Sequence, residues 1–150
     1  MIKVDNIVIP DSVRRIDECA FYDCWLINIV IGNSVEFIGE EAFKDCTKLR
    51  HVTLPNTITQ IKAWTFSNCE SLRSITLPDN LVSIEKEAFY KCKSLEKLTI
   101  PDSVFYIGEH ERGDVAFGII GSAVAVLSEI AACFYYRAIS CGKYAFIGRV

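Results

Sequence analysis

The sequence predicts a solenoid of stacked repeats with a parallel β-sheet along one side, followed by a divergent C-terminal segment. The first observation is a phrase that recurs: Leu77-Pro78-Asp79-Asn80-Leu81 returns as Ile100-Pro101-Asp102-Ser103-Val104. The second is that related phrases begin at intervals of 22, 23, 23 and 23 residues, at Ile9, Ile31, Leu54, Leu77 and Ile100. Self-similarity at a fixed period indicates units that cannot bury their apolar face alone and therefore stack.

Other positions of the repeat agree at the same period. An isoleucine follows each phrase at Ile16, Ile38, Ile61, Ile84 and Ile107, and a phenylalanine follows at Phe21, Phe43, Phe66 and Phe89. Three residues after each phenylalanine comes a cysteine, and a leucine follows at Leu26, Leu49, Leu72 and Leu95. The single 22-residue interval arises because one residue is missing between Cys24 and Leu26.

The elements of one repeat follow in order from its residues. Segments 52–54, 75–77 and 98–100 alternate apolar and polar residues, which is the period of a half-buried strand. Proline, as at Pro78, has no N–H for a strand ladder, and the Asp, Asn and Ser residues after it favour a turn. Residues 85–89 are interpreted as a short helical turn that places Phe89 in the core.

The repeat resembles a known type. The pattern Leu-Pro-x-x-Leu-x-x-Ile-x-x-x-Ala-Phe-x-x-Cys-x-x-Leu-x-x-Leu-x-Ile, read from Leu77 to Ile100, is similar to the leucine-rich repeats of the BspA-like family, also called the Treponema pallidum class. The resemblance covers about residues 4–107 and departs at Gly32, where proline is replaced, and at Thr65, where alanine is replaced. It implies a curved right-handed solenoid without enzymatic activity that recognises proteins, often as a surface adhesin. A terminal cap is not visible, which is expected of a fragment or a small, atypical member.

Composition and charge narrow the classes of function. Lys and Arg number 16 and Asp and Glu 19, a net charge of −3, and both signs are interspersed along the chain. A basic stripe is absent, so nucleic acid is not an expected partner. The N-terminal residues lack the features of a secretory signal. The family resemblance implies a cell-surface or extracellular location, and the absence of a signal makes a cytoplasmic location the alternative.

Cysteine and histidine give no sign of a metal or catalytic site. Cys24, Cys46, Cys69 and Cys92 occupy one repeat position and are interpreted as a ladder of buried thiols. The C-x-x-C spacing typical of zinc sites does not occur, so we expect neither a metal nor another cofactor. Three further cysteines, Cys19, Cys133 and Cys141, lie off the ladder and are expected to be reduced.

Catalysis is not expected either. The two histidines, His51 and His110, have no acid or nucleophile at an interpretable spacing, so we do not expect an enzyme. The carboxylates on the turn segments, Glu40, Glu41, Glu85 and Glu87, are interpreted as a solvated surface.

The candidate binding face is the outward side of the predicted sheet, because solenoids bind partners on extended repeat surfaces. Arg50 and Arg73 would be neighbours on adjacent turns, and Glu96 could pair with Arg73. The predicted function is a non-catalytic module for a protein partner, and the alternative is a purely structural repeat segment or an intracellular scaffold. The candidate residues are Arg50, His51, Thr53, Arg73, Ser74, Thr76, Glu96, Lys97 and Thr99.

The repeat pattern fails after Ile107, which divides the chain into a solenoid, residues 1–107, and a divergent segment, residues 108–150. Arg112-Gly113-Asp114 matches the tripeptide of integrin ligands and is a possible adhesive motif. Ala116-Phe117 would fit a degenerate further repeat with five inserted residues. Residues 115–136 carry a single charge, at Glu129, and are long enough for a membrane span. The alternative is an apolar helix, residues 123–135, that caps the open end of the solenoid.

Overall fold

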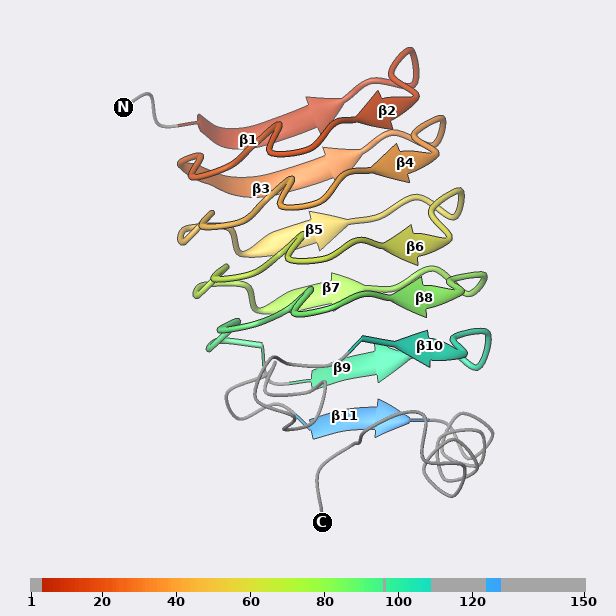
Figure 1. Cartoon of the computed structure of the whole chain (residues 1–150). Helices are drawn as coiled ribbons and strands as arrows, with labels where there is room; N and C mark the ends of the chain where they lie inside the picture. The colour runs from red at the N-terminus through yellow and green to blue at the C-terminus, as the bar shows by residue number, and fades with distance from the viewer. Residues whose placement is uncertain (1–3, 96, 109–123, 128–150) are drawn as a thin grey trace.

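The predicted solenoid is present in the computed structural model, which describes residues 4–95, 97–108 and 124–127 (Figure 1). Four parallel strands form its main sheet in the order β1 (Val4–Ile9), β3 (Leu26–Ile31), β5 (His51–Thr53) and β7 (Ser74–Thr76). The strand β9 (Lys97–Ile100) lies next to β7 and continues the stack. The register joins residues one repeat apart, as in His51 opposite Ser74. The predicted strand segments are therefore confirmed to within one residue.

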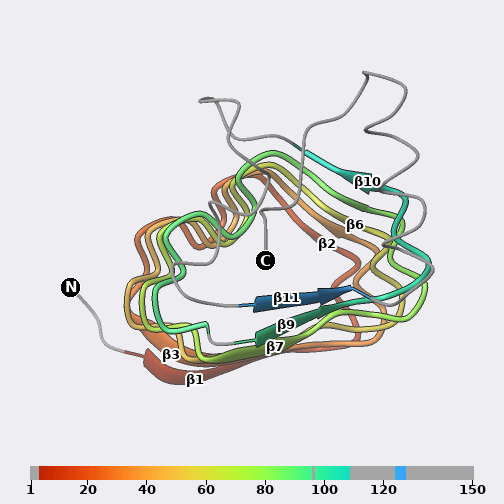
Figure 2. The same cartoon turned by 90° about the horizontal axis from the view of Figure 1, so that it is seen from below.

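A second row of short parallel strands runs along the stack, separate from the main sheet. It consists of β2 (Arg15–Ile16), β4 (Phe37–Ile38), β6 (Gln60–Ile61), β8 (Ser83–Ile84) and β10 (Tyr106–Ile107). Seen along the axis, successive turns lie over one another, with the two rows on different sides of each turn (Figure 2). Sequence periodicity did not predict this row, because strands of two residues are too short to show alternation.

Each main strand is followed by a turn that the proline phrase forms. The carbonyl oxygen of Pro78 accepts a hydrogen bond from Leu81 N at 3.0 Å, and that of Pro55 accepts one from Ile58 N at 3.2 Å. In the second repeat Gly32 takes the same role toward Val35 N. A Cβ on Gly32 would lie 2.6 Å from the carbonyl oxygen of Ile9, so this turn packs too closely on its neighbour for a side chain.

The predicted helical turn at residues 85–89 is wrong, and no helix occurs among the described residues. Glu87 and Lys91 have left-handed φ angles of 52° and 56°, which interrupt any right-handed helix. Backbone bonds instead alternate between the turn itself and the preceding repeat. Ala88 N donates to Glu85 O at 3.3 Å, whereas the carbonyl of Ala88 accepts from Phe66 N at 2.8 Å. The carbonyls that a helix would use internally are thus used to join neighbouring turns.

The core is built from the apolar positions that recur in every repeat. Phe43, Phe66 and Phe89 are fully buried and stack in one column with Phe21, which is partly exposed at the first repeat. Their ring centroids are 5.2, 5.4 and 5.5 Å apart and the rings are nearly parallel. Offset stacking of this kind contributes beyond simple burial. The recurring leucine and isoleucine positions surround this column.

Beyond residue 108 the structure describes one further strand, β11 (Val124–Leu127). It pairs in parallel with β9, with Val124 opposite Lys97 and Leu127 opposite Ile100. The predicted helix over residues 123–135 is therefore wrong at these four residues. Ile100 and Leu127 are 27 residues apart, one fewer than a 23-residue repeat with five inserted residues would give, so the degenerate further repeat stays a prediction.

The remaining C-terminal predictions fall outside the described residues. These are the tripeptide Arg112-Gly113-Asp114 and the rest of residues 115–136. In the part of the chain that is described, no helix has the length and apolar character needed to cross a membrane. The division into residues 1–107 and 108–150 stays a prediction.

Candidate binding face

The candidate face is formed by side chains that alternate along the main strands. On β5, His51 and Thr53 are exposed while Val52 between them is buried, because successive residues of a strand point to opposite sides. On β7, Ser74 and Thr76 are exposed in the same way. The sequence prediction that these four residues point outward is confirmed.

Arg50 and Arg73 stand immediately before these strands and are both exposed. Arg73 N donates a hydrogen bond of 3.0 Å to Arg50 O, which fixes the two residues on adjacent turns, as predicted. On β9, Thr99 is exposed. Glu96 and the side chain of Lys97 lie outside the described residues, so the pairing of Glu96 with Arg73 stays a prediction.

A row of polar side chains crosses the face and is longer than the sequence predicts. His51 Nδ1 lies 2.9 Å from Ser74 Oγ, and Asn28 Nδ2 donates to Asn6 Oδ1 at 2.8 Å. One register position of β1, β3, β5 and β7 holds these four polar residues, which are in strand order Asn6, Asn28, His51 and Ser74. The missed signal was the 22-residue spacing itself, which places Asn6 and Asn28 at the position of His51.

An apolar patch was also missed on this face. Val8 is 70% exposed and Val30 is 45% exposed, and both occupy the register position of Thr53 and Thr76. The face therefore changes from valine at the first two strands to threonine at the following ones. Exposed aliphatic side chains next to polar groups are a feature of protein-binding surfaces.

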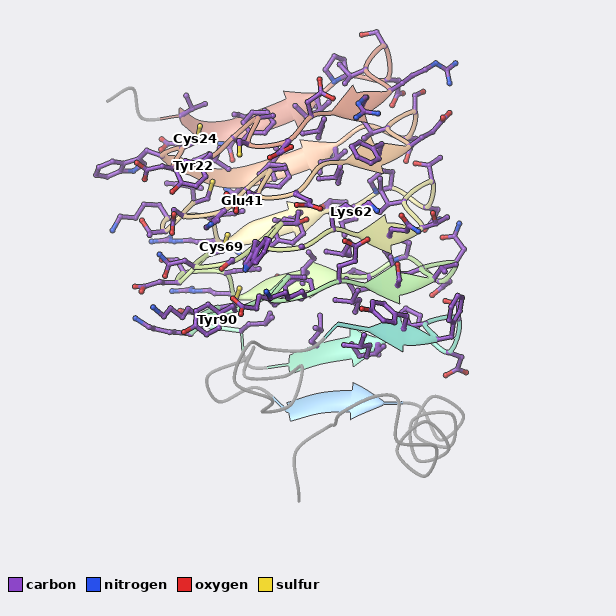
Figure 3. All side chains as sticks on the ribbon, viewed as in Figure 1. Tyr22, Cys24, Glu41, Lys62, Cys69 and Tyr90 are labelled. Atoms are coloured by element: carbon purple, nitrogen blue, oxygen red, sulfur yellow. The ribbon has the colours of Figure 1, made fainter. Side chains whose placement is uncertain are left out.

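The turn side of the solenoid is the side formed by the turn segments that carry Glu40, Glu41, Glu85 and Glu87. It differs from the solvated surface that the sequence predicts. Glu41, Glu85 and Glu87 are partly buried and bonded. Lys62 Nζ lies 2.8 Å from Glu85 Oε1, and Lys44 Nζ lies 2.9 Å from Glu41 Oε1 (Figure 3 labels Glu41 and Lys62). The hydrogen bond to Glu41 raises the pKa of Lys44.

Tryptophan contributes to the same network on the turn side. Trp64 Nε1 donates to Glu87 Oε2 at 3.0 Å, and Lys86 Nζ lies 4.9 Å from the centre of the Trp64 ring. Charged groups and rings on this side therefore bond to one another across adjacent turns. Only Glu40, among the four predicted carboxylates, is exposed.

The cysteine ladder is confirmed as a structural feature. Cys24 and Cys69 lie in one column along the axis (Figure 3), and Cys46, Cys69 and Cys92 are fully buried. Each buried thiol donates to a phenylalanine carbonyl of the preceding turn, at 3.0 Å for Cys46 and 3.2 Å for Cys69 and Cys92. Burial raises the pKa of Cys46 and Cys92 to about 12, so these thiols are poor nucleophiles and metal ligands.

The other cysteines lie away from this ladder. Cys19 is exposed, and the five described cysteines are all free. Cys133 and Cys141 fall outside the described residues. Across residues 4–95, 97–108 and 124–127, no group of three or more His, Cys, Asp or Glu side chains could hold a metal ion.

Comparison with solved structures gives matches with the same architecture. A leucine-rich repeat protein of Treponema pallidum is 34% identical with a TM-score of 0.67, over 69% of this chain and 51% of that one. One from Bacteroides ovatus is 36% identical with a TM-score of 0.68, over 70% and 30%. A leucine-rich cell surface protein of Faecalibacterium prausnitzii is 28% identical with a TM-score of 0.68, over 83% and 36%. The chain thus spans about half or less of each of these proteins. No curated protein matches it.

A family model also matches most of the chain. The model described as the BspA type leucine-rich repeat region matches residues 1–111 with six copies, one more than the five that the sequence analysis counted. Proteins of this type are non-enzymatic repeat proteins and generally protein-interaction modules. With its repeat spacing, its phenylalanine and cysteine columns and its parallel sheet all in agreement, the chain belongs to the BspA-type leucine-rich repeat family.

Proposed function

We propose that this chain is a non-catalytic module that binds a protein partner through the sheet face. The sheet face is defined as the outward side of β1, β3, β5, β7 and β9, together with Arg50 and Arg73. The observation that carries the proposal is the fixed register of these strands, which places exposed side chains in continuous rows across adjacent repeats. Solenoids use such extended, regular surfaces for binding.

The two long sides of the solenoid differ in the availability of their polar groups. On the turn side, lysines and carboxylates bond to each other, as in Lys62 with Glu85 and Lys44 with Glu41. On the sheet face, Thr53 and Thr76 point outward into solvent. A partner can therefore contact Thr53 and Thr76 without disrupting side-chain bonds between the turns.

The rigidity of the sheet supports the same proposal. Every residue of β5 is paired to β3 on one side and β7 on the other, so the side chains of this strand have fixed positions before binding. A preorganised surface loses little conformational entropy on association. The valines and threonines of the face also have few rotamers, which further reduces this cost.

We further propose that the module is displayed at a cell surface in an adhesin-like protein. The similar protein of Faecalibacterium prausnitzii is described as a cell surface protein, and this description supports the proposal. The alternative, a cytoplasmic interaction scaffold, is distinguished by protease treatment of intact cells. Cleavage of the chain by an external protease supports display, and full protection in intact but not in lysed cells contradicts it.

Binding is tested with purified chain and an array of extracellular protein domains. Thr53→Trp and Thr76→Trp enlarge the sheet face, and Thr59→Trp enlarges an exposed residue just before β6 as the matched control. A partner that binds the wild type and Thr59→Trp, but not the two sheet-face variants, supports the proposal. If all three variants lose binding of the partner equally, or if none of them loses it, the result contradicts binding through the sheet face.

A further inference from the structure

Arg50 and Arg73 differ from the other cations of the described chain. Eight other lysines and arginines have an acidic or aromatic partner, namely Arg14, Arg15, Lys44, Lys48, Lys62, Lys86, Lys91 and Lys93. The side chain of Lys97 is not described. Within the residues that the structure describes, only Arg50 and Arg73 have cationic side chains with neither kind of partner.

These two unpaired cations are neighbours. The backbone bond from Arg73 to Arg50 places them on adjacent turns, where equivalent positions of a parallel sheet are about 4.8 Å apart. Like charges opposite each other on a sheet are destabilising. Among the described residues, this pair therefore forms a local concentration of positive charge on the sheet face, although the net charge of the chain is −3.

We infer that the sheet face takes an extended acidic segment of its protein partner, with carboxylates bound by Arg50 and Arg73. This inference rests on the proposed function and specifies the partner's chemistry. A guanidinium group donates two parallel hydrogen bonds to a carboxylate, so arginine is well suited to this contact. Alternate side chains of an extended segment are about 6.7 Å apart on one side, which the long arginine side chains can span.

The apolar patch of the same face supplies the second part of the contact. Val30 lies next to Thr53 in the register, and Val8 lies next to Val30. Their exposure of 45% and 70% leaves aliphatic surface that a partner can cover. The favoured segment therefore combines carboxylates above the arginine pair with aliphatic residues above the valines. A nucleic acid would need a longer row of cations than this pair.

The test uses the full chain and a dye-labelled dodecapeptide of alternating Glu and Val, with Gln-Val and Lys-Val peptides for comparison. Fluorescence anisotropy gives the Kd for the wild type and for the double variant Arg50→Gln, Arg73→Gln. The matched control, Arg14→Gln with Lys93→Gln, removes the same charge from two exposed cations that already have acidic partners, Glu36 and Glu70. We expect the Kd to rise about tenfold or more in the first variant and less than about twofold in the control.

A second variant separates binding from folding. Arg73→Glu places an acid beside Arg50, which replaces repulsion by attraction, so we expect its Tm to equal or exceed that of the wild type. The same variant should lose the Glu-Val peptide. A lower Tm together with unchanged binding would overturn the inference, because the changes in stability and in peptide affinity would then both differ from those expected.

Several other results of the peptide experiment would overturn the inference. Equal weakening in both double variants, equal binding of the Gln-Val peptide, or no binding of the Glu-Val peptide overturns the inference. Displacement of the peptide by inorganic phosphate alone, with the same arginine dependence, assigns the pair to small anions and also overturns it. If array partners require Thr53 and Thr76 but not the arginines, this inference fails while the proposed function stands. If no partner requires the sheet face, the proposed function fails.

Discussion

Replacement of Phe66 by alanine should destabilise the chain strongly, because this residue occupies the middle of the phenylalanine column. Its side chain is fully buried, and its ring stacks on Phe43 at 5.4 Å and on Phe89 at 5.5 Å. Removing a buried phenylalanine side chain costs about 3–5 kcal/mol. Two ring neighbours place Phe66→Ala in the upper part of this range, since each aromatic pair adds about 0.5–1.5 kcal/mol.

Phe21→Ala is the matched control for this prediction. Phe21 has the same repeat position but is partly exposed and stacks on one ring only, that of Phe43 at 5.2 Å. We expect its loss to be about half as large, on the order of 1.5–2.5 kcal/mol. Urea unfolding followed by circular dichroism gives the free energy of unfolding for both variants. Equal losses, or a larger loss for Phe21→Ala, would show that the column does not stabilise the chain through stacked burial.

Three further predictions concern the thiols, the left-handed residues and a glycine. Thiols of the unfolded chain ionise near pH 9.0, whereas Cys46 and Cys92 in the folded chain have a pKa of about 12. Between these pH values the folded state keeps protons that the unfolded state loses, so the free energy of unfolding should fall as the pH rises. Urea titrations across this range should show a smaller fall for the double variant Cys46→Ala, Cys92→Ala, and an identical fall would contradict the assignment. Lys91 has a φ of 56°, so the variant Lys91→Gly should be more stable than Lys91→Ala by about 1 kcal/mol. At Lys93 the alanine variant should be more stable than the glycine variant. Thermal unfolding of these four variants checks the sign at each position. Gly39→Ala should cost about 1–3 kcal/mol, because its Cβ would lie 2.4 Å from Glu18 N; a urea midpoint equal to the wild type's would refute the clash.

The fold could be predicted well from the sequence because its determinants recur. Burial of an apolar position in one repeat implies burial of the same position in the next, so five weak signals combine into a strong one. The phenylalanine, cysteine and isoleucine columns and the proline turns were all predicted on this basis and are present. The strand register followed from the repeat length alone.

The turn segment was mispredicted because its conformation depends on neighbouring repeats. Residues 85–89 have helix-forming composition, and local propensity favours a helical turn. In the structure Glu87 is left-handed, and the carbonyls of Lys86, Ala88 and Tyr90 accept bonds from Trp64, Phe66 and Asn68 of the preceding turn. Bonds between residues 22 apart cannot be inferred from a local window, so stacking overrides the helical preference.

The candidate site was predicted in outline but not in extent. Alternation along β5 and β7 identified the exposed residues correctly, and the missed members lie on the first two strands. Asn6, Val8, Asn28 and Val30 occupy the same register positions, but their strands are more apolar and were less clearly alternating. The ion pair of Glu85 with Lys62 joins residues 23 apart and cannot be found from a local window, whereas that of Glu41 with Lys44 spans three residues.

The structure separates the groups that join the repeats from those that are available to a partner. On the turn side, repeats are joined by ion pairs such as Lys62 with Glu85, so a charge change there alters stability. On the sheet face, the backbone ladder joins the strands, and Arg50, Thr53, Arg73 and Thr76 can change without loss of a ladder bond. These four side chains are therefore free to vary with the partner while the fold is kept. This separation predicts that substitutions at Arg50 and Arg73 will change binding far more than stability, and substitutions at Lys62 and Glu85 will do the reverse.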